Sequence, residues 1–177
     1  MEVRAKAPKI ENVRVIQVAD MGRCGKQRGA DQDKRIEALL KTWKKANRDL
    51  GAIDYKGSTA DGFWWCDTRG VNVWQSRKAL ALVGTPCPNI ASLQARYSAI
   101  VGHAVELEDE SLTTFIEGYI QAEFTQAIGR VRANRRPGEE IVVYVVSDFD
   151  LTPLQERLGF VLEIVKASDV TPEAGSK

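Results

Sequence analysis

Apolar residues are concentrated along this chain in six short runs, each bounded by turns or by segments with helical spacing. The runs lie at 13–19, 52–57, 63–67, 79–86, 141–146 and 160–167. They are rich in Val, Ile, Leu, Ala and Trp, and they are continuous instead of alternating with polar residues. Continuous apolar strands are typical of a mostly parallel sheet covered by helices on both faces.

Segments with helical periodicity separate these runs. The sequence predicts a helix over 33–50, where apolar residues recur at spacings of three and four. Asn89 is a good N-cap for a second helix, over 90–102. Five apolar residues fall on one face of that helix: Ile90, Leu93, Tyr97, Ile100 and Val101.

The longest helical pattern begins at Ser111 and ends at the break made by Pro137 and Gly138. Gly118, inside it, is a position where the helix can bend or break. Thr152 and Pro153 then open a short helix. Strands and helices thus alternate, which predicts a three-layer α/β domain of RecA-like type over 13–167, with an N-terminal extension at 1–12 and a flexible tail at 168–177.

The composition is that of a globular protein: 177 residues, 44% hydrophobic and 28% charged, with a net charge of +1. Binding to a polyanion must therefore come from local clusters of charge. Three widely spaced cysteines and one histidine, His103, argue against a zinc site or a disulfide scaffold. Since no apolar stretch approaches the length of a membrane span, we expect no membrane partner and a cytoplasmic location.

A basic helix end provides the first candidate chemistry. Gln126, Gly129 and Arg130 share one face of the long helix, while Ile128 and Val131 point toward the core. An arginine suits a phosphate because its planar guanidinium donates two parallel hydrogen bonds. The plainer alternative is a solvated basic helix end, since arginines also favour the C-terminal dipole.

The loop DTRGVN at 67–72 provides the second candidate. Gly70 allows a tight turn after the strand at 63–67, and Arg69 and Asn72 would then be polar contacts in a cleft. Taken alone, an Arg-Gly pair followed by Asn is a common loop.

Together, DTRGVN and QAIGRVRANRR (126–136) resemble motifs V and VI of superfamily 2 helicases, in family order. The resemblance covers about 49–151 and is to the second, C-terminal RecA-like domain, as found in large plasmid- or phage-type replication proteins. It implies that Arg130 is an arginine finger toward ATP, with Gln126 beside it. The same resemblance places Arg69, Gly70, Asn72, Gly129 and Arg132 at the nucleotide.

Two departures from the family pattern limit this interpretation. Ala133 stands where the family has its second arginine, and Arg132 is turned about 100° away from that face. The loop GRCGKQ at 22–27 lacks the spacing and the Ser/Thr of a Walker A loop. ATP and Mg²⁺ would therefore be held mainly by an N-terminal RecA-like domain, in the same polypeptide or a separate chain. We expect this chain to be inactive alone.

Nucleic-acid contacts are predicted at Trp74, which can stack on a base, and in the basic loop at Arg23, Lys26 and Arg28. The expected partner is single- or double-stranded DNA, with RNA as another option. The alternatives are a core tryptophan and a solvated loop.

Two other functional readings stay open. One is a non-enzymatic RecA-like module that binds nucleic acid or a replication partner. The other is a small Rossmann-like enzyme with its site at Asp148 and Asp150, although ordinary acids at a strand end explain these two residues as well.

Overall fold

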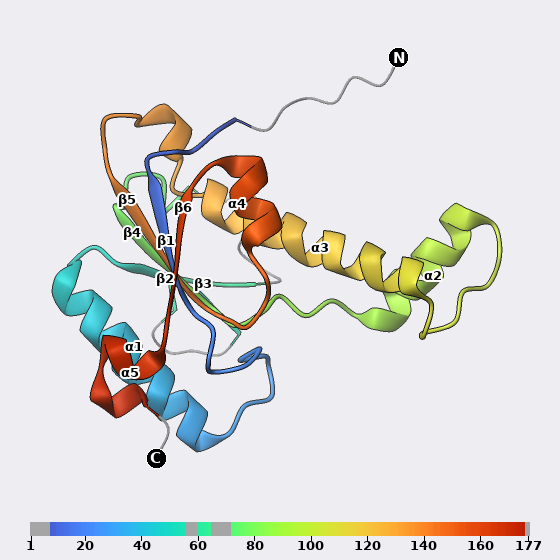
Figure 1. Cartoon of the computed structure of the whole chain (residues 1–177), viewed down its shortest axis with the longest axis horizontal. Coiled ribbons are helices and arrows are strands. Elements are labelled where there is room, and N and C mark those ends of the chain that lie inside the picture. Colours follow the sequence, from blue (N-terminus) through green and yellow to red (C-terminus); the bar gives the residue numbers. More distant parts are fainter. Residues whose placement is uncertain (1–7, 56–59, 65–71, 176–177) are drawn as a thin grey trace.

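A computed structural model of the chain describes residues 8–55, 60–64 and 72–175. Its centre is a six-stranded sheet in the order β3-β2-β4-β5-β1-β6, in which every neighbouring pair is parallel (Figure 1). The strands are β1 (Val13–Val18), β2 (Gly51–Asp54), β3 (Gly62–Phe63), β4 (Ala79–Val83), β5 (Ile141–Val146) and β6 (Val161–Val165). Each of the six apolar runs contains one strand or part of one, so the predicted parallel α/β sheet is confirmed.

The described helices are α1 (Ala30–Ala46), α2 (Ile90–Val101), α3 (Glu110–Gly129), α4 (Thr152–Leu158) and α5 (Ala167–Val170), with short 3₁₀ turns η1 (Ala133–Arg135) and η2 (Pro172–Ala174). α1 and α5 lie on one side of the sheet, and α3 and α4 lie on the other (Figure 1). The predicted three-layer arrangement is therefore present. In the part of the chain that the structure describes, no helix is long and apolar enough to cross a membrane.

Alternation within the central strands supplies both layers of core. In β4, Leu80 and Leu82 join the cluster that contains Phe124 of α3. Ala79, Ala81 and Val83 join the cluster under α1. All five β4 residues are fully buried. Small side chains on the α1 side leave room for Trp43, which stacks on Tyr144 of β5 with ring centroids 4.4 Å apart.

Both predicted chain ends belong to the domain, which corrects the proposed boundaries. Ile10 is buried in the core and its amide donates to the Leu158 carbonyl at 2.8 Å, so the described part of the N-terminal extension is packed. The tail predicted as flexible forms α5 and η2 as far as Ala174, whose side chain is fully buried and whose carbonyl accepts from Arg35 at 2.7 Å. The polar composition suggested a flexible tail, but two buried alanines, Ala167 and Ala174, anchor this segment.

The long helix ends earlier than predicted: α3 stops at Gly129, and the short turn η1 follows it before the break at Pro137 and Gly138. α3 continues without interruption through Gly118. Its N-cap is Asp109, whose carboxylate accepts from the Ser111 amide at 2.8 Å. With α2, the first half of α3 projects from the body as an arm (Figure 1).

Gly84 offers a sharp test of how tightly the loop after β1 packs on the sheet. Gly84 has φ +86°, and a Cβ on it would lie 2.2 Å from the Cys24 carbonyl oxygen. We expect Gly84→Ala to lower the free energy of unfolding by more than about 2 kcal/mol. Alanine is strained at this φ, and its Cβ would clash with the Cys24 carbonyl oxygen. The measurement is a urea unfolding curve with constant m-value.

Gly118→Ala is the matched control. A Cβ at Gly118 meets nothing within 4 Å, and the residue lies inside a helix. Alanine there should stabilise the protein by about 0.5–1 kcal/mol. Two changes of the same sign and size would contradict the packing described at Gly84.

Candidate functional site

Two groups of polar residues lie at opposite ends of the parallel strands, the amino edge and the carboxyl edge of the sheet. One group lies at the amino edge, where α3 ends and η1 leads into β5. The amides of Ile141 and Val142 at the start of β5 donate to the carbonyls of Asn12 and Lys78, which directly precede β1 and β4. The other group lies at the carboxyl edge, in the loops that follow β1, β2, β4 and β5. Parallel sheets usually bind ligands at this second edge.

At the amino edge, the structure brings together parts of the two sequence motifs. Arg132 donates to the Asn72 side-chain oxygen at 3.0 Å, across 60 positions of sequence. Arg136 donates to the Arg77 carbonyl at 2.7 Å and to the Val131 carbonyl at 2.6 Å. Asn72, the one residue of DTRGVN that the structure describes, therefore contacts the turn that follows α3. Arg69 and Gly70 lie outside the described residues.

The side chain of Asn12 stabilises the turn after α3 by hydrogen bonds. Its amide nitrogen lies 2.9 Å from the carbonyl oxygens of Arg136 and Glu139 and 3.3 Å from that of Ala133. Asn12 was absent from the sequence prediction, since a lone Asn before a strand gives no sign of contacts more than 120 positions away. These bonds fix the turn in which the arginines stand.

Arg130, unlike Arg132 and Arg136, makes no side-chain hydrogen bond or ion pair to any residue of the described ranges. It is the C-cap residue of α3, and its Nε is buried with no hydrogen bond there. Burial, and then the charge of Arg132, lower the pKa of the Arg130 guanidinium from its usual value. A buried polar group without a partner costs free energy, and an anion would relieve that cost.

Two residues predicted beside Arg130 differ in their exposure. Gln126 is half-buried one helical turn earlier, and Gly129 is exposed. A Cβ on Gly129 would meet no atom within 4 Å, so that glycine is not needed for packing inside this chain. The face predicted from the sequence is thus open at Gly129 and cationic at Arg130.

Arg132 has an unusual backbone. Its φ of 51° lies in the left-handed region, which a side chain with a Cβ adopts at a cost of about 1–2 kcal/mol. This conformation ends α3, begins η1 and allows the Arg132 side chain to reach Asn72.

Trp74 is not available to a base. Its side chain is fully buried in the core, so the predicted stacking contact is wrong for this structure. The reason is its position over Gly51, where a Cβ would lie 2.7 Å from the Trp74 ring. Trp74 instead anchors the turn that carries Asn72.

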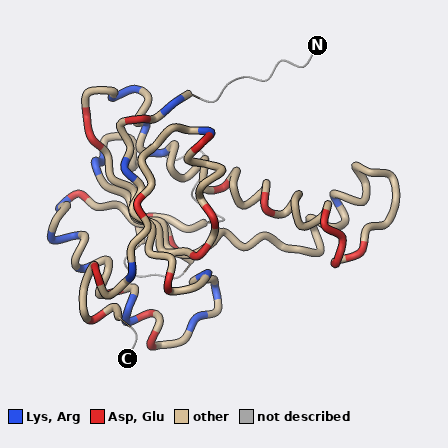
Figure 2. Tube along the Cα trace, in the orientation of Figure 1, with Lys and Arg blue, Asp and Glu red and all other residues tan. Residues whose placement is uncertain are grey.

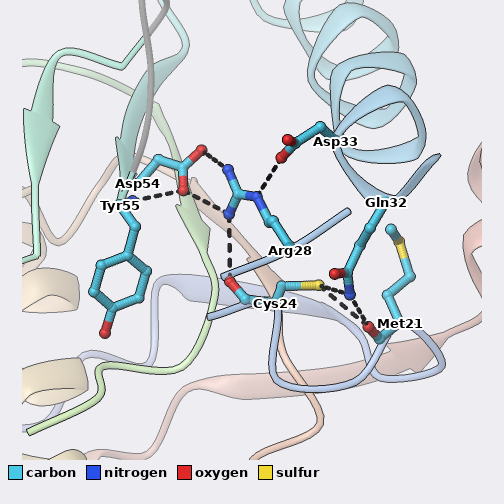
Figure 3. A network of polar contacts seen from close by, with 7 residues as sticks. All are labelled: Met21, Cys24, Arg28, Gln32, Asp33, Asp54 and Tyr55. Atoms are coloured by element: carbon cyan, nitrogen blue, oxygen red, sulfur yellow. Dashed lines mark hydrogen bonds and ion pairs between the residues drawn. The ribbon is translucent and has the colours of Figure 1, made fainter. Parts of the chain in front are cut away.

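At the carboxyl edge, Arg28 joins its own loop to β2 and α1 (Figure 3). It donates to both carboxylate oxygens of Asp54, at the end of β2, at 2.8 and 2.6 Å. It also contacts Asp33 of α1 at 2.5 Å, with only 3% of its own side chain exposed. Although burial works to lower the pKa of Arg28, its hydrogen bonds to Asp54 and Asp33 prevail and raise that pKa. Arg28 is therefore structural, which corrects its predicted contact with a phosphate backbone.

Arg23 and Lys26 of the same loop are exposed. Lys26 lines an open depression of about 630 Å³ together with Gln27, Arg28, Gly29 and Tyr55. These two cations are thus the predicted nucleic-acid contacts of the loop that can reach a ligand.

The loops after β4 and β5 are closed by their own hydrogen bonds. Thr85 and Ser147 share a hydroxyl contact of 2.6 Å, and Gln17 donates to the carbonyls of Ser147 and Phe149. Asp150 accepts from the Thr152 amide at 2.9 Å, and this bond is the main reason why its pKa lies below the usual value. Within 8–55, 60–64 and 72–175, no three His, Cys, Asp or Glu residues converge on a metal position.

Comparison with known proteins adds no assignment: no protein-family model, curated protein or solved structure matches the chain.

The strain at Arg132 leads to one prediction. Arg132→Ala and Arg132→Gly both remove the contact with Asn72, but only glycine adopts φ 51° at little cost. We expect the Gly variant to be more stable than the Ala variant by about 1 kcal/mol in urea unfolding. An Ala variant as stable as the Gly variant would mean that this turn relaxes once the side chain is gone.

Cys24 leads to a second prediction. Burial is the main cause that raises its thiol pKa to about 11, and Gln32 contacts its Sγ at 3.2 Å (Figure 3). Because the thiolate is the reactive form, a raised pKa slows alkylation near neutral pH. At pH 8 iodoacetamide should modify exposed Cys87 at least about 100-fold faster than Cys24, as followed by peptide mass mapping. Equal rates would show that the loop after β1 opens readily.

Proposed function

We propose that this chain is the C-terminal motor domain of a nucleic-acid-dependent ATPase, of the superfamily 2 helicase type, acting in cytoplasmic DNA replication. The observation that carries the proposal is Arg130, a cation at the end of α3 whose buried Nε has no partner in the described ranges. It stands beside Arg132, which binds Asn72 of the second motif. These contacts support the resemblance because they join residues that the two motifs assign to one site.

In this proposal Arg130 donates hydrogen bonds to the γ-phosphate of ATP bound by a partner domain. A guanidinium aimed at that group stabilises the negative charge that develops during phosphoryl transfer. Arg132 and Asn72 hold the surface beside it. Gln126, on the same face of α3, is the polar neighbour of the phosphate.

The chain's own residues fit one half of such a site. The cationic group is present, whereas the described residues offer no cluster of acids for Mg²⁺. When bound, Mg²⁺ neutralises phosphate charge. The triphosphate and the metal would thus be held by an N-terminal RecA-like domain, and this chain would supply the arginine from across the interface.

Nucleic acid would meet the other edge of the sheet. Arg23 and Lys26 are exposed there, beside the depression at Tyr55. Because two exposed cations contribute mainly attraction to phosphates, we expect weak binding to single-stranded DNA that falls steeply with salt.

The proposal predicts a selective loss of turnover. In the polypeptide or complex that joins this chain to its nucleotide-binding domain, Arg130→Ala should lower ATP turnover by about 10³-fold. ATP affinity should change little, because the other domain holds most of the triphosphate. Arg130→Lys should not restore turnover, since an ammonium cannot donate two parallel hydrogen bonds.

Arg135→Ala is the matched control, because Arg135 is exposed on η1 three residues beyond Arg132. It should leave turnover within about twofold of the wild type. Unchanged turnover in Arg130→Ala would overturn the finger assignment. If no Gly-x-x-x-x-Gly-Lys-Ser/Thr segment accompanies this chain in its gene or complex, the non-enzymatic binding module becomes the better reading.

A further inference from the structure

The arm has a small core of its own. Leu93 of α2, Val105 of the loop and Leu112 of α3 are buried, yet they belong to neither of the two clusters that fill the sheet layers. Tyr97 and Phe115 add a ring contact with centroids 5.0 Å apart. The Gln94 side chain and the Ser98 hydroxyl close the loop, through the Val105 carbonyl at 2.7 Å and the Val105 amide at 3.1 Å. The arm is thus held together by its own packing and hydrogen bonds.

One face of α2 is covered only in part. Spacing places Ile90, Leu93, Tyr97, Ile100 and Val101 on a single face, as expected for a helix that packs along its whole length. Only Leu93 of these is buried. Ile100 is 64% exposed and Val101 37%, and Leu107 in the adjoining loop is 55% exposed. Because contiguous exposed apolar residues usually mark a binding surface, this face points to a missing partner.

The charge around this face indicates the kind of partner. The chain contains 25 basic and 24 acidic residues, yet residues 87–117 hold five carboxylates against one arginine. Four of the five are consecutive or nearly so, at Glu106, Glu108, Asp109 and Glu110, next to exposed Leu107 (Figure 2). This surface repels a nucleic-acid backbone and anionic lipid, and it attracts cations.

We propose that the exposed α2 face and the acidic loop, defined by Ile100, Val101, Leu107, Glu106 and Glu108, dock a basic amphipathic segment of a partner protein. Apolar side chains of that segment extend the small core of the arm, and its lysines or arginines meet the carboxylates of the loop. Apolar contact supplies affinity, and charge complementarity supplies selectivity against acidic segments. This docking surface is independent of the Arg130 site.

The test uses the full 177-residue chain and two synthetic 14-residue peptides. One peptide places Leu and Lys at helical spacing, and the other carries Glu at every Lys position. We expect the Leu/Lys peptide to bind, with amide NMR shifts confined to 90–110, and the Leu/Glu peptide not to bind. Binding should weaken with salt, and Glu106→Gln/Glu108→Gln should weaken it at low salt.

Paired variants make the outcome decisive. Ile100→Ser/Leu107→Ser should lower peptide affinity at least about tenfold without unfolding the chain, because both side chains are exposed. Val161→Ser/Ile164→Ser, on exposed positions of β6, should leave affinity unchanged. Equal loss in both pairs, or shifts outside the arm, would overturn the proposal.

Two further results would also overturn it. A concentration-dependent dimer, detected by light scattering and removed by Ile100→Ser, would assign the face to a second copy of this chain. A single-stranded oligonucleotide that shifts the same arm amides would assign it to nucleic acid.

Discussion

Burial of the central strands on both faces is the constraint on which the rest of this structure depends. β4 has no exposed residue, and its neighbour β5 is buried at five of six positions. Such strands exist only where helices cover both sides, since an uncovered face would leave several large apolar side chains in water. The segments between the strands must therefore cover both faces of the sheet. This requirement explains the positions of α3, α4 and the segment before β5.

The same constraint places the arginines. A helix that covers β4 and β5 and then feeds β5 must end at the amino edge of the sheet. Arg130 and Arg132 stand at that end, where Asn12 fixes the turn. The two edges consequently have different characters. At the amino edge, Arg130 has no partner among the described residues. At the carboxyl edge, Arg28 is paired with Asp54 and Asp33.

The sequence predicted much of the fold because its signals were local. Continuous apolar runs marked every strand, and Asn89 marked the start of α2, whereas α3 ends at Gly129, before the predicted break at Pro137 and Gly138. What it missed depended on tertiary contact. Trp74 follows a turn and suggested exposure, but Gly51 makes a place for it in the core. Arg28 in a glycine-rich loop suggested a free cation, because nothing local reveals that Asp54, 26 positions later, ends the adjacent strand.

The candidate site was predictable only as a set of residue types. Glycine and arginine spacing selected Arg130, and the Arg-Gly-x-Asn pattern selected Asn72. The sequence could not predict that Arg132 would contact Asn72 and so bring the two motifs together, since this contact depends on a left-handed backbone at Arg132. Likewise, helical periodicity predicted the apolar face of α2, but it could not say that α3 would cover only part of it.

α3 sets the distance between two surfaces. It is one unbroken helix of 20 residues, about 30 Å long, with the arm built on its first half and Arg130 at its C-cap. Its inner half packs on the sheet through Ile120 and Phe124. A partner docked on the arm would therefore stand well away from the arginine, and both surfaces could be occupied at the same time.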